Sequence, residues 1–254
     1  MKKNILYILL LITSSVVQAQ DYKADYKKAL SIFGASSYEM KMEYLLYPTY
    51  NSLQEIEREY IHIKREDEQY NVDQFGVKAI QNNQHLLVIA EDYNLIAIDR
   101  KREKADDKKL DAQTLQNLDN ALEKLTKKLG LDTLNLQNNE PTYEVKHSTN
   151  DAKDRVYTFI FSEGQYEKMI VHFSDDAKLK KQIIYYQELV EIDINKFSKV
   201  RVEINFLKQV LNPNFKDNTF SISQYISVQD NGTVKALGKY SNFNLINHLE
   251  EIKY

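Results

Sequence analysis

The sequence predicts an α+β protein built mostly of antiparallel β-strands. It has 18 Tyr and 10 Phe but only 6 Gly and 3 Pro, and this composition favours long strands because aromatic residues suit a pleated sheet and chain breakers are few. In many segments apolar and polar residues alternate, which is the period of a half-buried strand. In two segments apolar residues recur every three or four positions instead, which is the period of a helix.

Residues 1–19 have the form of a secretory signal peptide. Lys2 and Lys3 precede an apolar run from Ile5 to Ile12, and small residues follow up to Ala19. We expect cleavage after Ala19 and export to the periplasm, with secretion from the cell as the second choice. A retained N-terminal anchor is the alternative, although the run is shorter than the ~20 residues that span a bilayer.

The composition of the predicted mature chain, residues 20–254, excludes several classes of protein. The chain contains no Cys, and therefore neither a disulfide framework nor a lipid-modified cysteine. Loss of Lys2 and Lys3 leaves 32 basic and 37 acidic side chains, and the net charge of −5 argues against nucleic acid as a partner. We expect a soluble protein with a sizeable core, either one large β-rich domain or two small ones, and the charged run from Arg100 to Lys109 is the only candidate boundary.

A short amphipathic helix is predicted at the start of the mature chain. Its apolar residues recur at spacings of three and four, and a glycine follows them. These residues are Tyr22, Tyr26, Ala29, Leu30 and Phe33, with Gly34 at the end.

About five strands are predicted after this helix. Met40, Met42 and Tyr44 alternate with charged residues, and Ile61 and Ile63 lie on the opposite side of a strand from their polar neighbours. The two methionines suit either a filled core or an adaptable apolar pocket.

The stretch from Asn82 to Lys104 predicts a hairpin with one unusually apolar arm. The runs Leu86–Ala90 and Leu95–Ile98 flank a polar turn. Because the first run is apolar on both faces, we expect it to be covered on both sides.

A second amphipathic helix is predicted from Asp111 to Leu129. Its stripe consists of Leu115, Leu118, Leu122, Leu125 and Leu129, and Gly130 follows. The repeat is too short for a coiled coil, so we expect the stripe to pack on the sheet as a lid over the apolar arm.

Strands are predicted again from Tyr143 to Tyr240. They are "YEVKH", "RVYTFIF", "YEKMIVHF", "LKKQIIYYQELVEI", "KVRVEINF", "FSISQYISV" and "VKALGKY". Asp230-Asn231-Gly232 between the last two predicts a tight turn.

Common catalytic and metal-binding patterns are not found in the sequence. The five His residues have no metal-ligand spacing, and there is no G-x-S-x-G motif, phosphate-binding glycine loop or Cys nucleophile. The acidic doublets Asp106-Asp107 and Asp175-Asp176 fit a charged run and a turn better than acid–base or calcium chemistry. We therefore expect no catalytic residue, metal or cofactor, and an enzyme without a recognisable motif is only the third alternative.

Three stretches between residues 22 and 190 resemble the LolA-like family of periplasmic lipoprotein carriers. They are "IHIKREDEQYNV", "IQNNQHLLVIAEDYNLIAID" and "YEKMIVHFSDDAKLKKQIIYY", in an order of helix, strands, helix and strands that also resembles the family. The resemblance implies a strongly curved, incomplete β-barrel with helices as a lid. It places the family's functional Arg, which grips the lid, on Arg65, although Glu66 stands where the family commonly has Pro and the chain lacks the family's Trp.

The resemblance implies one LolA-like domain over residues 20–254, with about 191–254 as extra C-terminal strands. We expect a carrier or chaperone that binds an acyl chain, lipoprotein or lipid in an apolar concavity under the lid, with an inner- or outer-membrane envelope protein as a further partner. The predicted ligand-binding residues are Met42, Tyr44, Ile61, Ile63, Arg65, Leu87, Ile89, Leu118, Leu122 and Leu125. The alternative is a non-catalytic structural or adaptor protein of the envelope with a filled core.

Overall fold

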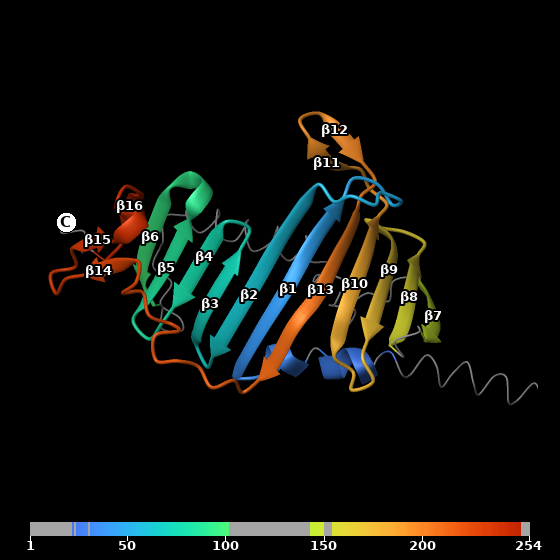
Figure 1. The fold of residues 1–254 in the computed structure, drawn as a ribbon, viewed down its shortest axis with the longest axis horizontal. Helices are drawn as coiled ribbons and strands as arrows, with labels where there is room; N and C mark the ends of the chain where they lie inside the picture. Colours follow the sequence, from blue (N-terminus) through green and yellow to red (C-terminus); the bar gives the residue numbers. More distant parts are fainter. Residues whose placement is uncertain (1–21, 23, 30, 102–142, 150–153, 250–254) are drawn as a thin grey trace, which may run out of the picture. The chain divides into compact units, whose positions relative to one another are not determined.

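The computed structural model describes residues 22, 24–29, 31–101, 143–149 and 154–249 (Figure 1). Within these ranges β-strand is the main regular structure, and residues 24–29 are helical. Three short 3-10 helices accompany them: η1 (Ser31–Gly34), η2 (Glu91–Tyr93) and η3 (Gly238–Tyr240). The mostly antiparallel β class and the N-terminal helix are confirmed. The helix predicted from Asp111 to Leu129, and with it the lid, lies outside the described residues.

The chain divides into two compact units. Unit 1 comprises Met1–Gly34, Glu43–Arg58 and Leu122–Leu207, and unit 2 comprises Ala35–Met42, Glu59–Ala121 and Lys208–Tyr254. Strands β1 (Ser37–Tyr47), β2 (Glu57–Glu66) and β13 (Arg201–Leu211) contribute residues to both units. The hydrogen-bonded strand order is β16-β6-β5-β4-β3-β2-β1-β13-β10-β9-β8-β7, an open series with two different end strands.

In unit 1 the sheet strands beside β13 are consecutive and antiparallel. They are β10 (Leu179–Tyr186), β9 (Tyr166–Phe173), β8 (Arg155–Phe161) and β7 (Tyr143–Thr149). A separate hairpin of β11 (Val190–Asp193) and β12 (Lys196–Ser198) follows β10, so the stretch predicted as one long strand from Leu179 to Ile192 is two strands.

In unit 2 five strands follow one another as an antiparallel meander from β2. The other four are β3 (Gln69–Gln74), β4 (Val77–Gln81), β5 (His85–Ala90) and β6 (Leu95–Arg100). A small hairpin of β14 (Ile226–Val228) and β15 (Val234–Ala236) turns at the predicted Asp230-Asn231-Gly232, where Gly232 has a φ of 83°. The last strand, β16 (Asn244–Asn247), was not predicted and pairs parallel to β6.

The helix of unit 1 packs on one face of its sheet through aromatic rings. The centroid of the Tyr22 ring lies 5.4 Å from that of Phe159, and the centroid of the Tyr26 ring lies 5.7 Å from that of Phe173. Between these two tyrosines, Asp25 is buried, accepts a hydrogen bond from the Tyr157 hydroxyl at 2.9 Å and pairs with Arg155 at 3.1 Å. The predicted apolar face of this helix is therefore the face that covers the sheet.

Among the described residues, no helix is long and apolar enough to cross a membrane.

Candidate functional site

The strand register in unit 2 defines two sheet faces, which we call face A and face B. Directly paired residues of neighbouring strands lie on the same face. Face A is followed through the pairs Ile63 with Val72, Val72 with Ala79, Ala79 with Val88, and Val88 with Ala97. Face B is followed through His62 with Asp73, Asp73 with Lys78, Lys78 with Ile89, and Ile89 with Ile96.

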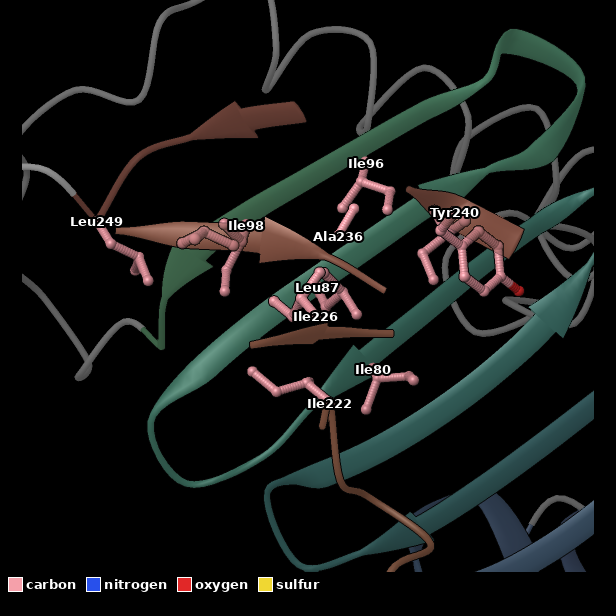
Figure 2. Packing of buried hydrophobic residues seen from close by; sticks show 11 residues of the cluster. Ile80, Leu87, Ile96, Ile98, Ile222, Ile226, Ala236, Tyr240 and Leu249 are labelled. Carbon is pink, nitrogen blue, oxygen red and sulfur yellow. The ribbon is translucent and has the colours of Figure 1, made fainter. Parts of the chain in front are cut away.

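Face B is filled by the protein's own C-terminal segment. Ile80, Leu87, Ile89, Ile96 and Ile98 on this face are all 0 % exposed (Figure 2). They pack against six buried residues of the C-terminal segment, Ile222, Ile226, Val234, Ala236, Tyr240 and Leu249.

Polar contacts fix the position of this C-terminal cover. The Asn71 side-chain amide donates to the Thr219 carbonyl at 2.8 Å, and the Tyr240 hydroxyl donates to Glu91 at 3.0 Å. Lys239 also pairs with Glu91 at 2.8 Å. Hydrogen bonds from Lys239 and Tyr240 hold the pKa of Glu91 below its ordinary value, so this carboxylate is charged at neutral pH.

Face A has a different character, because most of its apolar side chains from β2 to β6 are only half-buried. Ten apolar residues from β2 to β6 share it and are of intermediate exposure. They are Ile63, Tyr70, Val72, Val77, Ala79, Leu86, Val88, Ala90, Leu95 and Ala97. Such a contiguous apolar surface is suited to binding an apolar ligand by burial, without covalent chemistry.

One end of face A carries a polar group on β2. The Arg65 guanidinium approaches the Tyr38 hydroxyl closely enough to influence its pKa, and the Arg65 Nε donates to the Asp67 carbonyl at 3.0 Å. Burial raises the pKa of Tyr38, and the charge and hydrogen bond of Arg65 act against this rise. A guanidinium at the end of an apolar surface can bind a carboxylate, phosphate or carbonyl oxygen.

The structure assigns the predicted site residues to different places. Face A carries Ile61, Ile63 and Arg65 of β2. Met42 and Tyr38 of β1 lie on the same face, because Glu39, which points to the other side of β1, contacts His62 of face B at 2.8 Å. Ile61 and Met42 are buried, whereas Ile63 and Arg65 are half-buried.

The predicted set does not form a single lining. Leu87 and Ile89 lie on face B, in the filled core, and therefore not on the face that carries Ile61 and Ile63. Tyr44 is buried and belongs to unit 1, where burial, with smaller contributions from Glu57 and Tyr186, raises its pKa. Leu118, Leu122 and Leu125 lie outside the described residues.

Sequence reasoning missed the central residues of face A. Val72, Ala79, Val88 and Ala97 were not selected, because β5 is apolar at every position from Leu86 to Ala90 and its period gives no choice between Leu87 and Val88. The signal was in β3, which β4 separates from β5: Val72 lies between polar Asn71 and Asp73 and so identifies the apolar side.

Metal sites and surface pockets add no further candidate. The described residues contain no group of His, Asp or Glu side chains arranged to hold a metal ion. A surface pocket in unit 1 is lined by Pro48, Ser52, Leu53, Gln54, Glu55 and Ile56, which includes none of the predicted ligand-binding residues.

No protein-family model and no curated protein matches the sequence. Several solved structures, however, are similar to this chain over most of its length. An uncharacterized conserved protein from Thermus thermophilus has 4 % identity and a TM-score of 0.39, with 79 % of this chain and 92 % of that chain covered. A LolA superfamily protein from Nitrosomonas europaea has 11 % identity and a TM-score of 0.29, with 80 % and 98 % covered.

A third structure, lipoprotein LppX from Mycobacterium tuberculosis, has 11 % identity and a TM-score of 0.35, with 76 % of this chain and 97 % of that chain covered. All three TM-scores are below 0.5.

Proposed function

We propose that the protein is a non-catalytic carrier or chaperone that binds an acyl chain of a lipid or lipoprotein on face A of unit 2. The observation that supports this proposal most directly is the contrast between the two faces of one sheet. Face B is closed by the chain's own C-terminal segment, whereas the ten apolar residues of face A remain half-buried.

The energetics of face A are suited to such a ligand. Burial of apolar surface contributes about 25 cal/mol per Å², so one long acyl chain supplies several kcal/mol without any polar contact. Arg65 at the end of this face offers a cation for the ligand's polar end. The signal-peptide pattern of residues 1–19 supports a place for the carrier in the periplasm, where acyl chains of lipoproteins need shielding from water.

A lipid that co-purifies with the protein would support this function. The protein is isolated from its native compartment, extracted under denaturing conditions and analysed by mass spectrometry for lipids. We expect a stoichiometric acylated molecule. If none is found and the protein shows no saturable binding of a fluorescent fatty-acid analogue, the carrier function is contradicted, and a stoichiometric envelope protein recovered in its place would favour the adaptor alternative.

Two substitutions locate the ligand on face A. In Ile63→Thr together with Val88→Thr, each new hydroxyl would be buried beneath an apolar ligand at a cost of about 1–3 kcal/mol. We expect affinity for the fluorescent fatty acid to fall at least tenfold. Tyr60→Thr is the matched control, because Tyr60 is exposed on the opposite face of the same strand. Equal loss in both variants would place the ligand elsewhere.

A further inference from the structure

Large exposed apolar side chains gather at one end of unit 1. Leu53 is 97 % exposed in the loop between β1 and β2, and Ile194 is 83 % exposed at the turn of the β11–β12 hairpin. Ile56, Leu189 and Phe197 on the same two segments are each at least half exposed. We call these five residues the apolar tips. Such a concentration on two ordered segments indicates a binding surface, because single exposed apolar residues normally scatter.

Hydrogen bonds join the loop to the ends of β10 and β13, the two strands between which the hairpin lies. Arg201, directly after the hairpin, donates to the carbonyl oxygens of Tyr50 and Ser52 in the loop, and its guanidinium stacks 3.9 Å above the Tyr47 ring. The Tyr50 hydroxyl donates to the Tyr186 carbonyl, where the chain enters the hairpin. The hairpin and the loop therefore emerge at the same end of unit 1, as Figure 1 shows. Their tips are preorganised, which lowers the entropy lost on binding.

Lysines on the hairpin have acidic partners within unit 1. Lys196 pairs with Asp193 at 2.6 Å, and Lys199 pairs with Glu167 at 3.8 Å. Electrostatic attraction to an anionic surface is therefore weak here, and burial of apolar side chains must supply most of the binding.

We propose that the apolar tips insert shallowly into the surface of a zwitterionic lipid bilayer. Four of the five side chains are aliphatic, whereas protein-binding hot spots are dominated by Trp, Tyr and Arg. At roughly 100 Å² of apolar surface per fully exposed aliphatic side chain, the tips offer well below the ~800 Å² per partner of a standard protein interface. A bilayer needs no complementary pocket, and it accepts projecting side chains at any spacing.

This docking goes beyond the proposed function and does not depend on it. The apolar tips belong to unit 1, and face A belongs to unit 2. A protein that binds soluble fatty acid but ignores vesicles would contradict the docking alone, and the reverse result would contradict the carrier function alone.

Tryptophan fluorescence offers a direct test, since the chain contains no Trp. Leu53→Trp and Ile194→Trp are prepared separately in the full mature chain and mixed with phosphatidylcholine vesicles that carry brominated acyl chains. We expect a blue-shifted emission and strong quenching in both variants. Leu211→Trp, at a position 52 % exposed in unit 2, is the control and should show neither. Absence of quenching at both tips, or equal quenching at all three positions, would overturn the proposal.

A loss of binding should accompany the gain of signal. In Leu53→Asp combined with Ile194→Asp, we expect vesicle flotation to show a partition coefficient at least tenfold lower, because two apolar anchors are lost. Leu207→Asp combined with Leu211→Asp is the matched control, and it should float as the unmodified protein does. Binding should change little between low and high salt. A dimer in solution that the tip substitutions disperse would overturn lipid docking in favour of self-association.

Discussion

The N-terminal helix of unit 1 and the C-terminal segment of unit 2 each cover one sheet face, with different chemistry. The helix uses aromatic rings and a buried carboxylate, Asp25, bonded to Tyr157 and Arg155. The C-terminal segment covers face B mainly with aliphatic residues that meet isoleucines and a leucine of zero exposure. The first cover depends on directional contacts, and the second depends on close packing. Substitutions should therefore act differently in the two units.

The largest effect is expected where packing dominates. Leu87→Ala removes a fully buried side chain from face B and leaves a cavity, so the free energy of unfolding should fall by about 2–5 kcal/mol in urea denaturation. Leu86→Ala is the control, because Leu86 is the neighbouring half-buried residue on face A. Equal losses in the two variants would remove the distinction between the faces.

A smaller effect is expected at the polar contact of unit 1. Asp25→Asn keeps the shape of the side chain but removes the charge that Arg155 faces, so we expect a loss of about 1.5–3 kcal/mol. Tyr157→Phe removes only the hydroxyl donor and should cost about 1 kcal/mol. Thermal unfolding of both variants measures the difference. If Asp25→Asn were as stable as the unmodified protein, close packing alone would hold the helix.

A glycine with a positive φ in each unit allows the cost of backbone strain to be compared between the two units. Gly76 in unit 2 and Gly164 in unit 1 have φ values of 71° and 99°, so Ala at either position should cost roughly 1–2 kcal/mol. At Gly76 a Cβ would also lie 2.8 Å from an Asp92 carboxylate oxygen, whereas at Gly164 nothing lies within 4 Å. Gly76→Ala should therefore cost more, and Asp92→Ala should relieve the excess. If the variant with both Gly76→Ala and Asp92→Ala were no more stable than expected from Gly76→Ala alone, the whole loss of stability would come from the positive φ.

The smallest effect is expected on the pH dependence of the free energy of unfolding. Burial, with a smaller contribution from Arg100, lowers the pKa of His85 below its ordinary 6.5. Near this pKa the folded protein binds fewer protons than the unfolded chain. The stability that neutral His85 contributes is therefore fully present above pH 6.5 and is lost as the pH falls through the folded pKa. Denaturation between about pH 5 and 7 should show a shallower loss of stability for His85→Gln. An unchanged slope would mean that other groups carry the dependence.

The sequence predicted local structure well where its period was unambiguous. The alternation around Ile61 and Ile63 correctly predicted which side of β2 is apolar, and the spacing from Tyr22 to Ala29 correctly predicted the covering face of the helix. Asp230-Asn231-Gly232 correctly predicted a hairpin turn because its glycine supplies a positive φ. Each of these predictions depends on residues that are close together in the chain.

Long-range structure could not be predicted in the same way. The apolar arm Leu86–Ala90 indicated that both faces needed a cover, but nothing in its own residues showed that Ile222 and Ile226 would cover face B. The parallel pairing of Asn244 with Leu95 also depends on contacts between distant segments. Local alternation was enough to place Ile61 and Ile63 on one side of β2, whereas the apolar run Leu86–Ala90 has no alternation and did not show that Leu87 and Ile89 lie on face B.

The parallel pairing of β16 with β6 has a consequence for biosynthesis. A ribosome completes β4, β5 and β6 long before it reaches residues 220–249, so Ile80, Leu87 and Ile98 emerge without the segment that buries them. Chains with such high contact order fold slowly and are prone to aggregate while nascent. These side chains therefore stay exposed until residues 220–249 have left the ribosome.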